Sequence, residues 1–119
     1  VFANVAFFEE QLQKILVSSP NLKVLILDAV SINEVDASGD HMLRDYYRRL
    51  KETGVNMLFT RVRKPIEAVF ERSQLFKDVD RSFFHRNPTD VYEHAWRLIV
   101  ASEAAEKTEA ELLKSQDSE

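Results

Sequence analysis

Apolar and polar residues follow one another along this chain in blocks that predict strands alternating with helices. The strongest block is the nearly unbroken apolar run of residues 22–30, which is typical of a strand that is covered on both faces. A second strand is predicted at residues 55–62, and a short edge strand at residues 83–85. We expect residues 22–30 to form the central strand of the sheet.

Apolar residues at helical spacing predict four helices around these strands. Asn4 is a candidate N-cap for the first helix, and the second occupies residues 40–53, where Gly54 can supply a left-handed C-terminal cap. The third covers residues 65–72, and the last begins at Pro88. Strands that alternate with helices in this way indicate an α/β fold with a small, mostly parallel sheet and about four helices.

The two ends of the chain differ from the rest. Residues 1–3 resemble the end of a strand that begins upstream, so we expect the opening strand to be truncated. We expect residues 1–102 to form the domain and residues 103–119 to form an acidic polar tail with little apolar surface to pack. That tail carries six acidic and two basic residues, which accounts for the whole formal charge of −4.

Composition excludes several classes of protein. The 45 % apolar share with only 2 Gly and 3 Pro argues for a folded chain, and the lack of Cys rules out disulfides and thiolate metal sites. No apolar run reaches the length of a membrane span. Since the part outside the tail is neutral, the charge balance gives no support for nucleic-acid binding.

The loop at residues 31–39 is the first candidate site, because the carboxyl ends of parallel strands gather at one edge of a sheet. Ser38 would lie at the start of the following helix, where a hydroxyl caps the helix and a phosphate is also tolerated. Asp36 either positions a hydroxyl or caps the helix. The adjoining Gly39 and Asp40 are further candidate contacts for a partner, an anion or a nucleotide.

The second candidate loop follows the strand at residues 55–62. Its basic residues Arg61, Arg63 and Lys64 either attract an anion or are simply solvated. Enzyme signatures are missing, since the chain has no Gly-x-Ser-x-Gly elbow and no phosphate-binding Gly-rich loop. The three histidines show no metal-ligand spacing, and Trp96 is most simply a core or packing residue. The sequence therefore favours a non-enzymatic domain without a metal or cofactor.

Several segments together resemble the STAS domain, which sulphate transporters share with anti-sigma-factor antagonists. The likeness covers roughly residues 2–100 and rests on residues 25–28 and 36–39, the amphipathic helix, and residues 51–55. Residues 71–76 resemble the family's Glu-Arg-Ser-Gly-Leu segment, with Gln74 in place of the glycine. Residues 2–8 resemble more specifically the C-terminal STAS domains of SulP anion transporters.

This resemblance implies a small α/β sandwich and a function. Ser38 matches the position that a partner kinase phosphorylates in the antagonists, and Asp36 matches the acidic residue before it. The resemblance implies a cytoplasmic regulatory domain of an inner- or plasma-membrane transporter for sulphate or a similar anion. Its partners would be the transmembrane domain of the same transporter or a soluble protein, and a homodimer is a further alternative.

Two other functions remain open at this point. One is a free-standing anti-sigma-factor antagonist that works as a phospho-switch. The other is a nucleotide-binding domain that uses Asp36, Ser38 and the loop at residues 61–64, since some STAS domains bind nucleotide.

Overall fold

The sheet has three parallel strands in the order β1-β2-β3, as seen in a computed structural model that describes residues 2–3, 8–32 and 40–117. Its strands are β1 (Phe2–Ala3), β2 (Val24–Asp28) and β3 (Asn56–Thr60). Phe2 pairs with Ile26, and β2 pairs with β3 from Val24 opposite Asn56 to Asp28 opposite Thr60. The predicted central strand and the parallel pairing are therefore confirmed.

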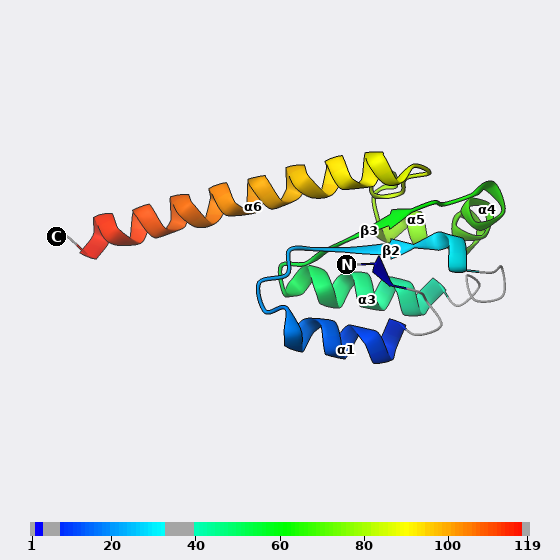
Figure 1. The fold of residues 1–119 in the computed structure, drawn as a ribbon, viewed down its shortest axis with the longest axis horizontal. Helices are drawn as coiled ribbons and strands as arrows, with labels where there is room; N and C mark the ends of the chain where they lie inside the picture. Colours follow the sequence, from blue (N-terminus) through cyan, green and yellow to red (C-terminus); the bar gives the residue numbers. More distant parts are fainter. Residues whose placement is uncertain (1, 4–7, 33–39, 118–119) are drawn as a thin grey trace.

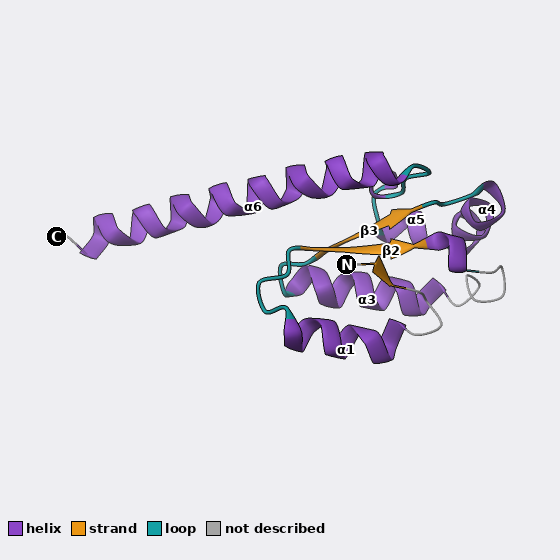
Figure 2. Ribbon diagram, viewed as in Figure 1, coloured by secondary structure: helices purple, strands orange, loops and turns teal. Residues whose placement is uncertain are grey.

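Helices cover both faces of this sheet (Figures 1 and 2). α1 and α3 lie on one face, and α6 runs along the other, while α4 and α5 lie near the carboxyl ends of the strands (Figure 1). The α-helices are α1 (Phe8–Ser18), α3 (Asp40–Glu52), α4 (Lys64–Ser73), α5 (Leu75–Asp78) and α6 (Pro88–Asp117). Two 3-10 turns, η2 (Ala29–Ser31) and η3 (Arg81–Phe83), complete the described elements. The α/β class is confirmed, and α5 is a short helix that the sequence pattern did not predict.

Alternate residues of β2 point into two separate apolar clusters. Leu25 and Leu27 belong to the larger cluster, which the helices α1, α3, α4 and α5 close. Ile26 belongs to a smaller cluster on the opposite face, where Val91 and Ala95 of α6 pack. Successive side chains of a strand point to opposite faces of the sheet. A strand that is buried on both faces therefore needs apolar residues at successive positions.

The ends of the elements have local causes. Gly54 takes a φ of +82° after α3, and the Val55 N–H donates to the Leu50 carbonyl at 2.8 Å, which satisfies the last turn. Arg61 takes a φ of +54°, so β3 stops at Thr60 and is shorter than the predicted residues 55–62. The candidate N-cap Asn4 lies outside the described residues.

The predicted edge strand at residues 83–85 is wrong in extent. Phe83 belongs to η3, and Phe84 makes only an isolated parallel bridge to Phe59. The His85 N–H donates to the Phe59 carbonyl at 2.9 Å, which holds this segment beside β3. Asp80 explains the turn, because its carboxylate accepts from the Ser82 N–H at 2.8 Å and starts a 3-10 turn where the strand would begin.

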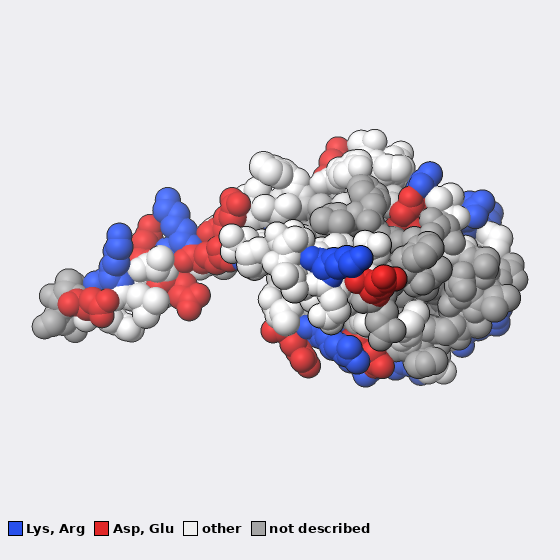
Figure 3. All heavy atoms as spheres, turned by 60° about the horizontal axis from the view of Figure 1, so that its bottom comes forward, with Lys and Arg blue, Asp and Glu red and all other residues white. Residues whose placement is uncertain are grey.

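α6 continues without a break through residue 102 and leaves the body of the domain (Figure 1). The molecule is therefore elongated, with principal extents of 58 × 26 × 24 Å. Figure 3 shows acidic and basic side chains interspersed along this projecting part. Lys23 forms an ion pair with Glu106, and Leu112 and Leu113 are exposed. Among the described residues, none of the helices combines the length and the apolar character needed to cross a membrane.

Trp96 does not pack in the core, contrary to the expectation from its residue type. It lies on the outer side of α6 with 66 % of its surface exposed, while Val91 and Ala95 face the sheet. A helix buries one stripe only, and the small residue Ala95 occupies that stripe beside Trp96.

Candidate functional site

An ion pair joins the carboxyl ends of β2 and β3. Arg61 donates from Nε to Oδ1 of Asp28 at 3.0 Å and from Nη2 to Oδ2, in a two-point contact. Oδ1 of Asp28 also accepts from the Val30 N–H at 3.1 Å, which caps η2. The hydrogen bonds from Arg61 hold the pKa of the Asp28 carboxyl below its usual value, against the opposing effect of burial. This pair fixes the two strand ends relative to each other.

The same contact changes the role expected for Arg61. The guanidinium of Arg61, which the sequence suggested as an anion-binding group, is paired with the carboxylate of Asp28. It therefore offers little net charge to a ligand. Its φ of +54° lies in the left-handed region that L residues other than Asn and Asp seldom occupy. Arg61 therefore has both the ion pair and the left-handed backbone conformation. Together they set the direction in which the chain enters α4.

A basic pocket of about 370 Å³ lies beside this pair. Arg63 and Lys64 are exposed at its rim, and neither pairs with a carboxylate within the part of the chain that the structure describes. Arg86 also lines it and pairs with Glu67 at 3.3 Å, so part of its charge is compensated. The pocket is lined by Val30, Arg61, Val62, Arg63, Lys64 and Arg86. The predicted cations of this loop are thus brought together at the carboxyl edge of the sheet.

Three of the other predicted site residues, Asp36, Ser38 and Gly39, lie outside the described residues. Asp40 is the first residue of α3, as the sequence pattern predicted for the helix start. The connection that carries Ser38 therefore leaves from η2 and returns at α3, and both of these ends are at the carboxyl edge (Figure 1).

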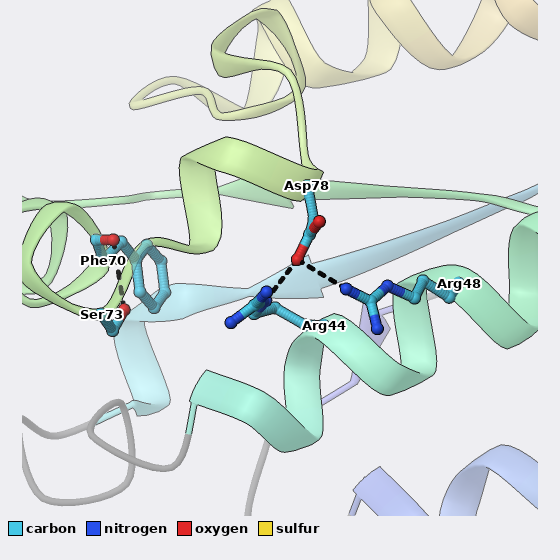
Figure 4. Close-up of polar contacts among 5 residues, drawn as sticks. All are labelled: Arg44, Arg48, Phe70, Ser73 and Asp78. Carbon is cyan, nitrogen blue, oxygen red and sulfur yellow. Dashed lines mark hydrogen bonds and ion pairs between the residues drawn. The ribbon is translucent and has the colours of Figure 1, made fainter.

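The helix that follows Ser38 is anchored by two arginines (Figure 4). Arg44 and Arg48 of α3 both donate to Oδ2 of Asp78 at the end of α5, Arg48 at 3.0 Å. The hydrogen bond from Arg44 is the main reason why the pKa of Asp78 lies below its ordinary value. Nearby, the Ser73 hydroxyl donates to the Phe70 carbonyl at 3.1 Å where α4 ends. These contacts fix the position of α3, which begins two residues after Ser38 in the sequence.

Two contributors to the site were missed by sequence reasoning, Asp28 and Arg86. Asp28 could have been found, because a carboxylate that ends a central strand lies opposite the end of the neighbouring parallel strand, where Arg61 follows. Arg86 had no such signal, since its position depends on how the segment after η3 returns to β3.

Comparison with known families agrees with this arrangement of strands and edge loops. The sequence profile of the STAS domain matches residues 1–90. The chain belongs to the STAS domain family. No curated protein matches the sequence significantly. The STAS match ends in the first turn of α6 and includes both candidate loops. Membership of this family suggests a regulatory or interaction role, as in anti-sigma-factor antagonists or in domains of transporters.

Proposed function

We propose that this STAS domain is the cytoplasmic regulatory domain of a SulP-type transporter for sulphate or a similar inorganic anion. It has no catalytic role, and it acts by docking the carboxyl edge of its sheet against the transmembrane domain of the same transporter. The observation that carries the proposal is the pairing of two features at one edge. One is the basic pocket with Arg63 and Lys64, and the other is the pair of described chain ends, at η2 and at the start of α3, between which Ser38 lies in the sequence.

The charges at this edge indicate the chemistry of the docked surface. Arg63 and Lys64 lack described carboxylate partners, so they favour an acidic segment as the partner. A phosphate on Ser38 would add up to about two negative charges near Asp36 and Asp40. Those charges would reduce the positive potential that attracts the partner, and docking would become weaker.

Transport by the full-length protein in membrane vesicles tests this proposal. We expect Ser38→Glu and Arg63→Ala/Lys64→Ala each to change the rate of anion uptake while the isolated domain keeps its melting temperature. The matched control is Lys107→Ala/Lys114→Ala, which removes the same charge from the exposed part of α6. If neither Ser38→Glu nor Arg63→Ala/Lys64→Ala changes the rate of uptake, a regulatory role for this edge is contradicted.

The family leaves a free-standing anti-sigma-factor antagonist as the alternative within the interaction class. The coding sequence upstream of Val1 separates the two, because ten or more membrane spans there support the transporter. A start codon shortly before Val1 would support the antagonist, whose partner would be a kinase that phosphorylates Ser38.

The basic pocket also favours a second candidate, which is binding of a nucleotide. Arg63 and Lys64 could hold phosphate oxygens, and Val30 and Val62 give the pocket an apolar part. Titration calorimetry with GTP and ATP tests this at about 0.15 M salt, where exposed charges are screened. Heat that disappears in Arg63→Ala/Lys64→Ala, and persists in Lys107→Ala/Lys114→Ala, would support a nucleotide site. No heat in the wild-type domain would rule it out.

A further inference from the structure

Two histidines outside the carboxyl-edge site form a direct contact. Nε2 of His85 lies 2.8 Å from Nδ1 of His94, with the ring planes at 78°. His85 belongs to the segment that lies along the open side of β3. Its N–H donates to the Phe59 carbonyl at 2.9 Å, and its own carbonyl accepts from the Val62 N–H at 3.1 Å. His94 lies in the second turn of α6. The imidazole contact therefore joins α6 to the edge of the sheet.

α6 holds the sheet through a short apolar stripe, Val91, Ala95, Leu98 and Ile99. Val91 and Ala95 are the residues of α6 that are almost fully buried, and they pack on Ile26 and Leu58. The ring of Phe83 meets His94 edge-on at 5.3 Å between centroids, so η3 packs against the same histidine. Because this cluster is small, a polar contact at its border contributes a larger share of the attachment than it would beside the main core.

The contact needs one ring nitrogen without a proton. A neutral imidazole has one N–H donor and one acceptor nitrogen, whereas both nitrogens of an imidazolium are donors. One ring can therefore donate while the other accepts, but two imidazolium rings would turn two N–H groups and two positive charges toward each other at 2.8 Å. The doubly protonated pair must separate.

The surroundings also disfavour the charged forms. Burial is the main cause that lowers the pKa of both histidines, and Arg97 of α6 lowers both further. His85 itself lowers the pKa of His94. Effects in the opposite direction are smaller than that of burial: Asp90 of α6 favours protonation of His85 and outweighs Arg97 there, and the Ser82 backbone with Asp80 favours protonation of His94.

We propose that the His85–His94 pair is an acid-operated clasp: it holds the first turns of α6 on the sheet at neutral pH, and when both rings are protonated these turns leave the sheet more often. Release uncovers the sheet face that Val24, Ile26 and Leu58 form under α6. The proposal does not rest on the carboxyl-edge function proposed above. A domain of this kind would change its exposed surface when its surroundings become mildly acidic.

The direction of the pH effect follows from linkage. Both folded-state pKa values lie below the ordinary 6.5, so the unfolded chain binds more protons than the folded chain in this range. Stability from the clasp is complete above about pH 6.5 and is lost as pH falls through the folded pKa values. The pKa values of Asp28, Asp78 and Asp80 lie below 3.8, so these carboxylates stay ionised at pH 5 and do not produce the effect.

Nuclear magnetic resonance of the domain tests the clasp directly. Imidazole nitrogen shifts should show two separate proton-binding steps for His85 and His94, with pKa values below the ordinary 6.5. Hydrogen exchange should show that the opening equilibrium of the His85 and Val62 amides rises about tenfold or more between pH 7 and pH 5, after correction for intrinsic exchange. Two rings that titrate independently near 6.5 would overturn the proposal.

A matched set of variants separates the clasp from general acid sensitivity. In His85→Gln/His94→Asn, side-chain amides replace Nε2 and Nδ1 without titrating, so the opening equilibrium should become independent of pH in this range. His41→Gln removes the remaining histidine of the chain and should keep the tenfold rise. A tenfold rise that persists in the double variant would also overturn the proposal. Should the double variant fail to fold, the ring titrations of the wild type still decide the question.

Discussion

Substitutions at two adjacent residues of β2 measure how the domain divides its stability between the two faces of the sheet. Ile26 is 5 % exposed and faces α6, whereas Leu27 is 0 % exposed and faces the larger cluster. Truncation of a buried Ile or Leu to Ala costs about 2–5 kcal/mol, depending on how far the surroundings relax into the space. Since the apolar cluster around Ile26 is smaller than the one around Leu27, we expect Ile26→Ala near the lower limit and Leu27→Ala near the upper one.

Urea unfolding followed by circular dichroism at pH 7.5 provides the two values, because the His85–His94 pair is intact at that pH. A loss of about 1 kcal/mol lowers the melting temperature of a domain of this size by several degrees, so the two variants are easily distinguished. An equal loss for both variants, or a larger loss for Ile26→Ala, would contradict the division into a major and a minor cluster.

Ile26→Asp extends the same test to the position of β2 in the sheet. An unpaired carboxylate under α6 costs several kcal/mol, which is comparable with the total stability of a small domain, so we expect this variant not to fold. The control is Val17→Asp on α1, where the side chain is 81 % exposed and the expected change is within about 0.5 kcal/mol. A soluble Ile26→Asp protein that melts cooperatively near the wild-type temperature would refute burial of β2 on both faces.

Three further outcomes are expected from stability measurements. Deletion of residues 105–119 should lower the melting temperature by only a few degrees, because it removes exposed helix and the surface ion pair of Lys23, and such pairs contribute little. A large loss of stability would show that this segment packs against the domain. Thr60→Val should stabilise the domain by about 1 kcal/mol, because the buried Thr60 hydroxyl has no hydrogen-bond partner among the described residues; a loss in urea unfolding would show that the hydroxyl is bonded. Ser38→Glu should leave the melting temperature nearly unchanged, because a helix N-terminus tolerates negative charge, and unfolding of this variant would identify the hydroxyl as part of the core.

The strands and helices could largely be predicted from the sequence, because each follows from the local pattern of apolar and polar residues, and tertiary packing does not change that outcome. Residues 24–27 are all apolar, as a strand buried on both faces requires. The end of α3 before Gly54 follows from capping chemistry that acts within a few residues. Such features need no knowledge of what packs against them.

Features that depend on tertiary position could not be predicted in the same way. Trp96 is an aromatic residue on an amphipathic helix, yet the stripe that faces the sheet is defined by Val91 and Ala95, and residue type alone does not identify that stripe. The contact of His85 with His94 depends on how the chain turns through η3 before α6 begins. Both cases require the path of the chain between elements, which hydrophobic periodicity does not contain.

Arg61 offers a test in which the sign of one substitution depends on a second residue. With Asp28 present, Arg61→Gly removes the ion pair that joins β2 to β3, and we expect a lower melting temperature. In an Asp28→Asn background that pair is already gone, while the φ of +54° at Arg61 still carries the strain of a side chain in the left-handed region. Arg61→Gly should therefore raise the melting temperature of the Asp28→Asn protein by a few degrees, and the double-mutant cycle gives the coupling between the two positions. If Arg61→Gly lowers the melting temperature equally in both backgrounds, the two residues do not act as a pair, and Arg61 would be available to bind an anion.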